Sequence, residues 1–188
     1  MAEIASNSPY AYDLGQLFVD QPEWFARETV PHTLAWLGAP TEPLRFSLLL
    51  AGGRASELTL RWSREELAPH LPDLDASVAR LREGRSIQAE QVPQYGAYGL
   101  AGVIASAVLG VRVLRLSAWS TPDLVFDSTP GALRGIEVAG RSHRGATGLR
   151  ELAEEKAPPL RSAPGVAEAW LSLWCAAPAV SLLLKVRP

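Results

Sequence analysis

A pair of short apolar runs around a turn constrains the fold of this chain more than any other feature. The runs are residues 124–127 and 134–139, and each contains β-branched or aromatic side chains. The residues between them, Ser128-Thr-Pro-Gly131, have the composition of a turn. Two such runs separated by a turn predict adjacent antiparallel strands.

The segments around this hairpin predict helices and further strands. In chain order we expect a helix at 95–109, a strand at 111–119, the two strands of the hairpin, a helix at 148–156 that ends before Pro158 and Pro159, a strand or helix at 167–175, and a strand at 179–186. This order predicts an α/β fold in which a mixed central sheet is flanked by helices.

The first 90 residues predict a separate group of elements. In chain order we expect an irregular arm at 1–13, helices within 14–37 that Pro22 and Pro31 divide, a β-hairpin at 44–62, a short helix after Ser63 and another at 73–83. We therefore divide the chain into an N-terminal helical and β-hairpin extension, residues 1–90, and a core domain, residues 91–188.

Charge and cysteine content limit the compartment and the partners. The formal net charge is −2, and a single cysteine, Cys175, excludes an intrachain disulfide. The apolar stretch at 98–111 is interrupted by glycine and is too short to span a bilayer, and the first residues lack the pattern of a signal peptide. We expect a soluble cytoplasmic protein with no membrane partner. Residues 111–150 carry three acids and six arginines, which agrees with a phosphate-bearing partner.

Two carboxylates flank the predicted hairpin. Asp123 opens its first strand, and Glu137 lies fourteen residues later, between apolar neighbours in the second strand. Antiparallel pairing brings both to one end of the sheet, where they can hold Mg²⁺ or Mn²⁺, with the backbone carbonyl of Val138 as a third ligand. A buried Glu137 requires such a partner, because an unpaired buried carboxylate is costly. Asp127 is an alternative ligand at the far end of the first strand.

This pattern resembles the core of the PD-(D/E)XK nucleases. The resemblance covers about residues 90–188 and rests on Pro122-Asp123, on Glu137-Val138-Ala139 and on the order of helices and strands. It implies a restriction-endonuclease-like core and a hydrolase that cleaves DNA phosphodiesters with Mg²⁺ or Mn²⁺, in defence or repair. Nucleic acid is then the expected partner.

The sequence departs from the family at the motif lysine, whose position is occupied by Ala139. Two residues can replace its charge. Lys156 can reach the site from the following helix, and Arg141 lies on the same face of the strand as Glu137. The alternative is an inactive relative that serves as an interaction or assembly subunit, with a protein partner or a second copy of itself.

Other residues near the predicted site have two interpretations. The loop at 140–148 contains Arg141, His143 and Arg144 among glycines, and is either a phosphate contact or a solvated loop. Trp119 is the one tryptophan that we place beside a substrate cleft, and we expect most of the six to pack in the core. The chain has no serine-hydrolase elbow, zinc-binding spacing, P-loop or dinucleotide fingerprint.

Overall fold

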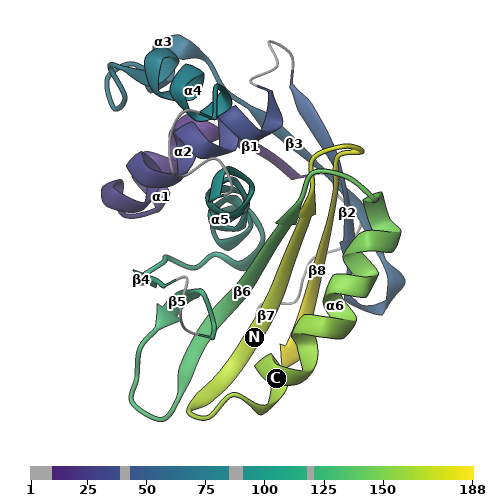
Figure 1. Ribbon diagram of the computed structural model, residues 1–188. Helices are drawn as coiled ribbons and strands as arrows, with labels where there is room; N and C mark the ends of the chain where they lie inside the picture. Colours follow the sequence, from purple (N-terminus) through teal and green to yellow (C-terminus); the bar gives the residue numbers. More distant parts are fainter. Residues whose placement is uncertain (1–9, 39–42, 85–90, 118–120) are drawn as a thin grey trace.

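The strands of this protein form one mixed eight-stranded sheet in the part of the chain that the structure describes. The structure is a computed structural model that describes residues 10–38, 43–84, 91–117 and 121–188. The helices are α1 Leu17–Asp20, α2 Glu23–Leu37, α3 Arg64–Leu67, α4 Leu74–Arg82, α5 Val92–Ile104 and α6 Gly145–Ser162. The strands are β1 Tyr10–Asp13, β2 Leu44–Leu50, β3 Ala55–Arg61, β4 Arg115–Leu116, β5 Leu124–Asp127, β6 Leu133–Arg141, β7 Val166–Cys175 and β8 Val180–Arg187. The strand order is β1-β3-β2-β8-β7-β6-β5-β4. Helix α6 covers one face of this sheet, and α5 with the remaining helices lies on the other (Figure 1).

The structure confirms the predicted α/β class with a mixed sheet flanked by helices. Helix α5, strands β4 to β6, helix α6 and strand β7 follow one another in the predicted order. Strands β5 and β6 are antiparallel, as the hairpin pattern predicts, and β6 and β7 are parallel neighbours joined through α6. Residues 167–175, for which the sequence predicts a strand or a helix, lie in strand β7. Its side chains alternate between the two faces: Trp170 and Trp174 pack on the α5 side, and Leu171 and Leu173 on the α6 side.

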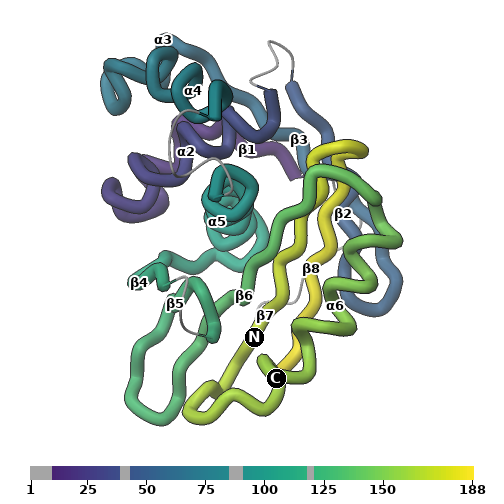
Figure 2. Tube along the Cα trace, in the orientation of Figure 1, coloured from purple at the N-terminus to yellow at the C-terminus, as the bar shows by residue number. Residues whose placement is uncertain are grey.

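Strands from the first 90 residues join the same sheet. The predicted hairpin forms as β2 and β3, and β2 pairs in parallel with β8, so residues 44–50 and 180–187 lie side by side (Figure 2). The predicted irregular arm is wrong for Tyr10–Asp13, which form β1 beside β3. Tyr12 is 5% exposed, and this burial favours a strand where the short segment gave no clear pattern. The predicted boundary at residue 90 falls in 85–90, outside the described residues.

Three prolines do not end helices where the sequence predicts. Helix α2 continues through Pro31, and α6 continues through Pro158 and Pro159. In α6 the next residue, Leu160, is fully buried against the sheet, and the Ser162 hydroxyl donates to the carbonyls of both prolines. The burial of Leu160 on the sheet therefore outweighs the backbone donors that the prolines lack, and the Ser162 hydroxyl bonds carbonyls in the last turn of the helix.

The predicted strand at 111–119 is shorter in the described residues, where only Arg115–Leu116 form β4. The backbone just before β4 forms hydrogen bonds with the side chain of Gln21. Gln21 donates through Nε2 to the carbonyl of Val111 and accepts through Oε1 from the amide of Val113. Trp119 lies outside the described residues. Trp24 is 49% exposed, so the expectation of core packing is wrong for this tryptophan.

Helix α5 packs closely on α2 because glycine recurs at every third position on one face. A Cβ atom at Gly99 would collide with Thr33, and one at Gly102 would collide with Phe25. The helix continues as a π-helical turn to Leu109. Among the described residues, one segment, Val92–Leu109, is long and apolar enough to cross a membrane by length and composition, which exceeds the run we expected; 61% of it is buried inside the protein.

Candidate active site

Asp123 lies just before β5, beyond the last β5–β6 pair, Leu124 with Ile136. Pro122 and the carbonyl of Leu124 pack over Gly135, where any side chain would collide with both. This close approach places the Asp123 carboxylate at the edge of β6, beyond the point where the described part of β5 pairs with it. There Oδ2 accepts a hydrogen bond of 2.8 Å from the backbone N–H of Val138. Asp123 is therefore buried and fixed to the backbone beside Glu137.

Glu137 projects from β6 toward α6, and Lys156 approaches it from that helix. The Lys156 ammonium lies 3.3 Å from Oε1 of Glu137. The second oxygen, Oε2, is buried and has no hydrogen-bond partner among the described residues. The Glu137 side chain is 8% exposed, whereas that of Lys156 is 35% exposed. Oε1 is therefore paired with Lys156, whereas Oε2 is buried without a hydrogen bond of its own.

The pKa values of both carboxyl groups in this site are raised. Burial, and then the charge of Glu137, raise the pKa of Asp123 to about 7, although Val138, Tyr98 and Lys156 act in the opposite direction. Burial also raises the pKa of Glu137, and Lys156 counteracts this. Two acids thus share one ammonium group, and the site is short of positive charge at neutral pH.

The structure adds two residues that the sequence did not single out. The hydroxyl of Tyr98 on α5 donates to Oδ1 of Asp123 at 3.2 Å, and Nε2 of Gln94 donates to that hydroxyl at 2.7 Å. Burial, and then the charge of Asp123, raise the pKa of Tyr98 well above its usual value, so it remains a donor. The available signal was a glutamine four residues before a tyrosine in an otherwise apolar helix.

The remaining predicted residues lie at different distances from this pair. The N–H of Val138 donates to Asp123. The carbonyl of Val138 faces the same edge of β6, because the N–H and C=O of one strand residue point to the same side. Arg141 is four positions beyond Glu137 on β6, about 13 Å along the strand. Asp127, at the opposite end of β5, accepts hydrogen bonds from the amide and hydroxyl of Thr129, which together lower its pKa, and so it acts as a turn residue.

The basic loop leads directly into α6. Arg144 pairs with Glu151 within that helix, and His143 is exposed. The Ser142 hydroxyl accepts a hydrogen bond from Trp36. Of the predicted loop, residues 140–141 end β6 and residues 145–148 begin α6, and no hydrogen bond or ion pair of the described residues joins the segment between them to the carboxylate pair.

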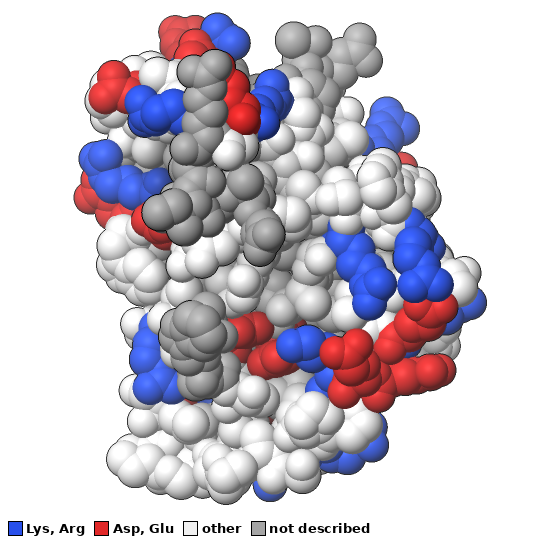
Figure 3. Space-filling view, in the orientation of Figure 1, with Lys and Arg blue, Asp and Glu red and all other residues white. Residues whose placement is uncertain are grey.

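Helix α6, which carries Lys156, also carries exposed acids. Figure 3 shows acidic side chains gathered over α6 with basic side chains beside them. The exposed acids of this helix are Glu151, Glu154 and Glu155. Glu151 pairs with Arg144, and these acids belong to the solvent-exposed face of α6.

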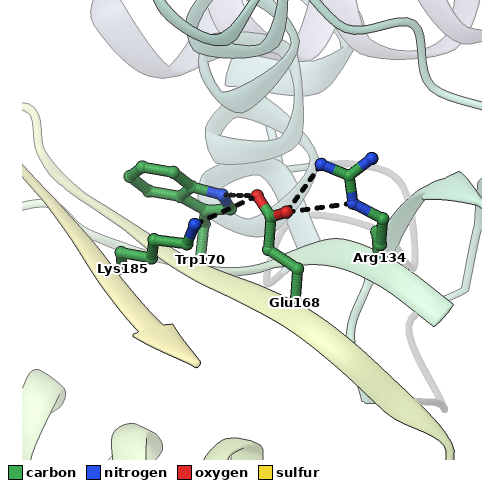
Figure 4. Close-up of polar contacts among 4 residues, drawn as sticks. All are labelled: Arg134, Glu168, Trp170 and Lys185. Carbon is green, nitrogen blue, oxygen red and sulfur yellow. Dashed lines mark hydrogen bonds and ion pairs between the residues drawn. The ribbon is translucent and has the colours of Figure 1, made fainter. Parts of the chain in front are cut away.

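A second polar cluster lies on the α5 face of the sheet and has the opposite balance of charge. Glu168 accepts from Arg134 through Nε at 2.9 Å and Nη2 at 2.6 Å, and from the Trp170 indole at 2.8 Å (Figure 4). Lys185 lies 3.8 Å away. Although burial acts to raise it, the pKa of Glu168 is lowered by these donors and charges. This cluster joins β6, β7 and β8 and is fully paired.

The carboxylate pair fits a divalent cation in its donor chemistry. Hard oxygen ligands suit Mg²⁺ and Mn²⁺, and the unpartnered Oε2 of Glu137 offers one. No group of three or more histidine, cysteine, aspartate or glutamate side chains suited to a metal occurs in the described ranges. The cation would therefore be held by Asp123, Glu137, the Val138 carbonyl and water.

No protein-family model, curated protein or solved structure matches this chain. The resemblance to PD-(D/E)XK nucleases therefore rests on its residues and on the order of its elements alone.

Proposed function

We propose that this chain is a metal-dependent nuclease that hydrolyses DNA phosphodiesters with Mg²⁺ or Mn²⁺. The observation that carries the proposal is the position of Lys156, whose ammonium lies 3.3 Å from Glu137 at the carboxylate pair. The family lysine follows the second acid by two residues, and Ala139 stands there in this chain. Lys156 supplies the same charge to the same face from α6.

The charge balance of the site supports a cation. Asp123 and Glu137 are each 6% exposed, and one ammonium group cannot neutralise both. When bound, a divalent cation polarises the phosphodiester and lowers the pKa of the attacking water. Asp123 and Glu137 hold it, and the Lys156 ammonium stabilises negative charge that develops on the phosphate. Arg141 lies farther along the strand and is suited to a neighbouring phosphate of the substrate.

The order of elements supports the same proposal. A helix, three antiparallel strands, a second helix and a parallel fourth strand occur in sequence, with Asp123 just before the second strand and Glu137 within the third. A cytoplasmic location is part of the proposal. It rests on the single buried cysteine, Cys175, which excludes an intrachain disulfide.

The test is cleavage of single- and double-stranded DNA and RNA with Mg²⁺ or Mn²⁺. We expect the wild type to cleave DNA and Glu137→Gln to lose at least about 1000-fold in rate, because several kcal/mol of charge stabilisation disappear. Glu154→Gln, an exposed acid on α6, is the matched control and should cleave normally. A wild type that cleaves none of these substrates would contradict the nuclease proposal.

A different observation favours the second candidate, an interaction or assembly subunit. Val19, Trp24 and Leu114 are 76%, 49% and 54% exposed. They lie on neighbouring segments, because Gln21 bonds the backbone at 111 and 113. Large apolar side chains that are exposed on neighbouring segments favour a protein-binding surface. If this surface joins two copies of the chain, Trp24→Ser will convert a dimer to a monomer in light scattering. A wild-type monomer that the substitution leaves unchanged would exclude such a homodimer.

A further inference from the structure

Helix α5 directs a pair of neutral polar side chains at the carboxylates. Gln94 and Tyr98 are four residues apart and therefore lie on the same face of the helix. Gln94 is exposed at the surface, whereas Tyr98 is completely buried. The pair thus forms a hydrogen-bonded connection from solvent to Asp123.

The direction of each hydrogen bond in this connection is fixed by chemistry. The Asp123 carboxylate that would hold a cation is ionised and only accepts, so in that state the Tyr98 hydroxyl donates its proton to Oδ1. The oxygen of that hydroxyl is then free to accept, and Nε2 of Gln94 donates to it. Each group therefore orients the next, from Gln94 to Tyr98 to Asp123.

Asp123 is held at both oxygens, and Glu137 is not. Oδ1 of Asp123 is fixed by Tyr98 from α5, and Oδ2 is fixed by the Val138 amide from β6. Each of these oxygens keeps a lone pair for a further partner. Among the described side chains Glu137 has one hydrogen-bond partner, Lys156 at Oε1, and the backbone of Asp123 also acts on it to lower its pKa, while its Oε2 has no partner. Asp123 is thus the pre-oriented acid of the pair.

The position of Tyr98 is itself set by packing. Its ring packs edge-to-face on Tyr95 at 5.5 Å, and Tyr95 in turn packs on His32 of α2 at 5.1 Å. The close contact between Gly99 and Thr33 fixes α5 against α2 at the same level. A hydroxyl held this firmly can orient a carboxylate with little loss of side-chain entropy.

We propose that Gln94 and Tyr98 are positioning residues that orient the Asp123 carboxylate for cation binding, an inference that rests on the proposed nuclease function. Groups that hydrogen-bond a metal ligand typically contribute 10–100-fold to metal affinity. The helix thereby acts on the cation through Asp123, without contacting it.

Calorimetric titration of Mn²⁺ into the full chain tests this proposal without relying on cleavage. We expect Tyr98→Phe to weaken Mn²⁺ binding by about tenfold and Gln94→Leu by a smaller factor. Gln94 is exposed, so its substitution tests the connection even if Tyr98→Phe lowers stability. Tyr95→Phe removes a hydroxyl from the adjacent ring and is the matched control, with unchanged affinity expected.

The outcomes separate this inference from the proposed function. Equal Mn²⁺ affinity in Tyr98→Phe, Tyr95→Phe and the wild type would overturn the positioning role and leave the nuclease proposal standing. A wild type that binds no Mn²⁺ would overturn both. In cleavage assays, a positioning role also predicts that Tyr98→Phe raises the Mn²⁺ concentration for half-maximal rate while KM for DNA stays constant.

Discussion

The two polar clusters of the sheet contain the same kinds of side chain in opposite proportion. The Glu168 cluster has one acid, two cations and an indole donor, and its carboxylate is satisfied at both oxygens. The Asp123 cluster has two buried acids and one ammonium group, and one carboxylate oxygen has no described partner. The pKa of Glu168 is lowered, whereas the pKa values of Asp123 and Glu137 are raised.

This difference distinguishes a polar cluster that stabilises the sheet from a cluster that is a candidate functional site. A complete cluster stabilises the strands that it joins and requires nothing from solvent. A buried cluster short of positive charge costs stability, and chains retain such clusters mostly where a ligand or a reaction uses the charge. The imbalance at Asp123 and Glu137 thus points to function more than the presence of acids alone.

The largest expected effect is the loss of the one ammonium group at the deficient cluster. Lys156→Ala should lower the DNA cleavage rate by about 1000-fold, within the range for a group that acts on the reacting phosphate. Adding Ala139→Lys to this variant places a lysine at the family position on the same face and should restore at least about tenfold. Single-turnover cleavage measures both. Unchanged cleavage in Lys156→Ala would separate the lysine from the chemistry.

The next effect is on the pH dependence of stability. Because the folded pKa of Asp123 is raised from 3.8 to about 7, the folded state binds its proton more tightly than the unfolded state. Its contribution to stability is therefore lost as pH rises from about 4 to about 7. Asp123→Asn should remove this loss and become more stable relative to the wild type by about 3 kcal/mol over that interval. Urea unfolding at both pH values measures it, and parallel curves would contradict the charge deficit.

The complete cluster should respond with the opposite sign. The folded pKa of Glu168 is lowered, so its stabilisation is present above its usual value of 4.5 and is lost as pH falls through the folded value. Glu168→Gln should cost about 2 kcal/mol at neutral pH, since it leaves Arg134 without a charged partner. Urea unfolding of this variant beside Glu154→Gln, which should be neutral, gives the difference. A stabilising Glu168→Gln would remove the contrast between the clusters.

The smallest effect on stability is expected from the removal of the Lys185 charge from the Glu168 cluster. Lys185 lies 3.8 Å from Glu168, and its side chain is 38% exposed. Lys185→Gln should therefore cost less than about 1 kcal/mol in urea unfolding and leave cleavage unchanged. A large loss of cleavage in this variant would mean that the α5 face of the sheet also takes part in the reaction.

The sequence predicts the hairpin and its acid pair for local reasons. Residues 124–127 and 134–139 contain their own strand signals, and pairing across one turn fixes which residues approach each other. Lys156 was one of two alternatives, because the direction of a helix that packs across a sheet depends on contacts distant in sequence. The structure places Lys156, and not Arg141, against Glu137.

The parts that could not be predicted depend on packing between distant elements. The path of α6 through Pro158 and Pro159 follows from the burial of Leu160, and β1 forms because β3 offers an edge. Gln94 and Tyr98 were missed because nothing in one helix indicates which of its polar side chains faces an acid 25 residues away. Burial on the folded sheet decides each of these features.

The most direct test of the charge deficit is a crystal structure of the chain with Mn²⁺, collected to locate its anomalous signal. We expect one peak at the carboxylate pair, within about 2.0–2.6 Å of oxygens from both Asp123 and Glu137, and no peak at Glu168. Crystals that show no Mn²⁺ at the pair, with Lys156 still against Glu137, would contradict a metal centre at this site.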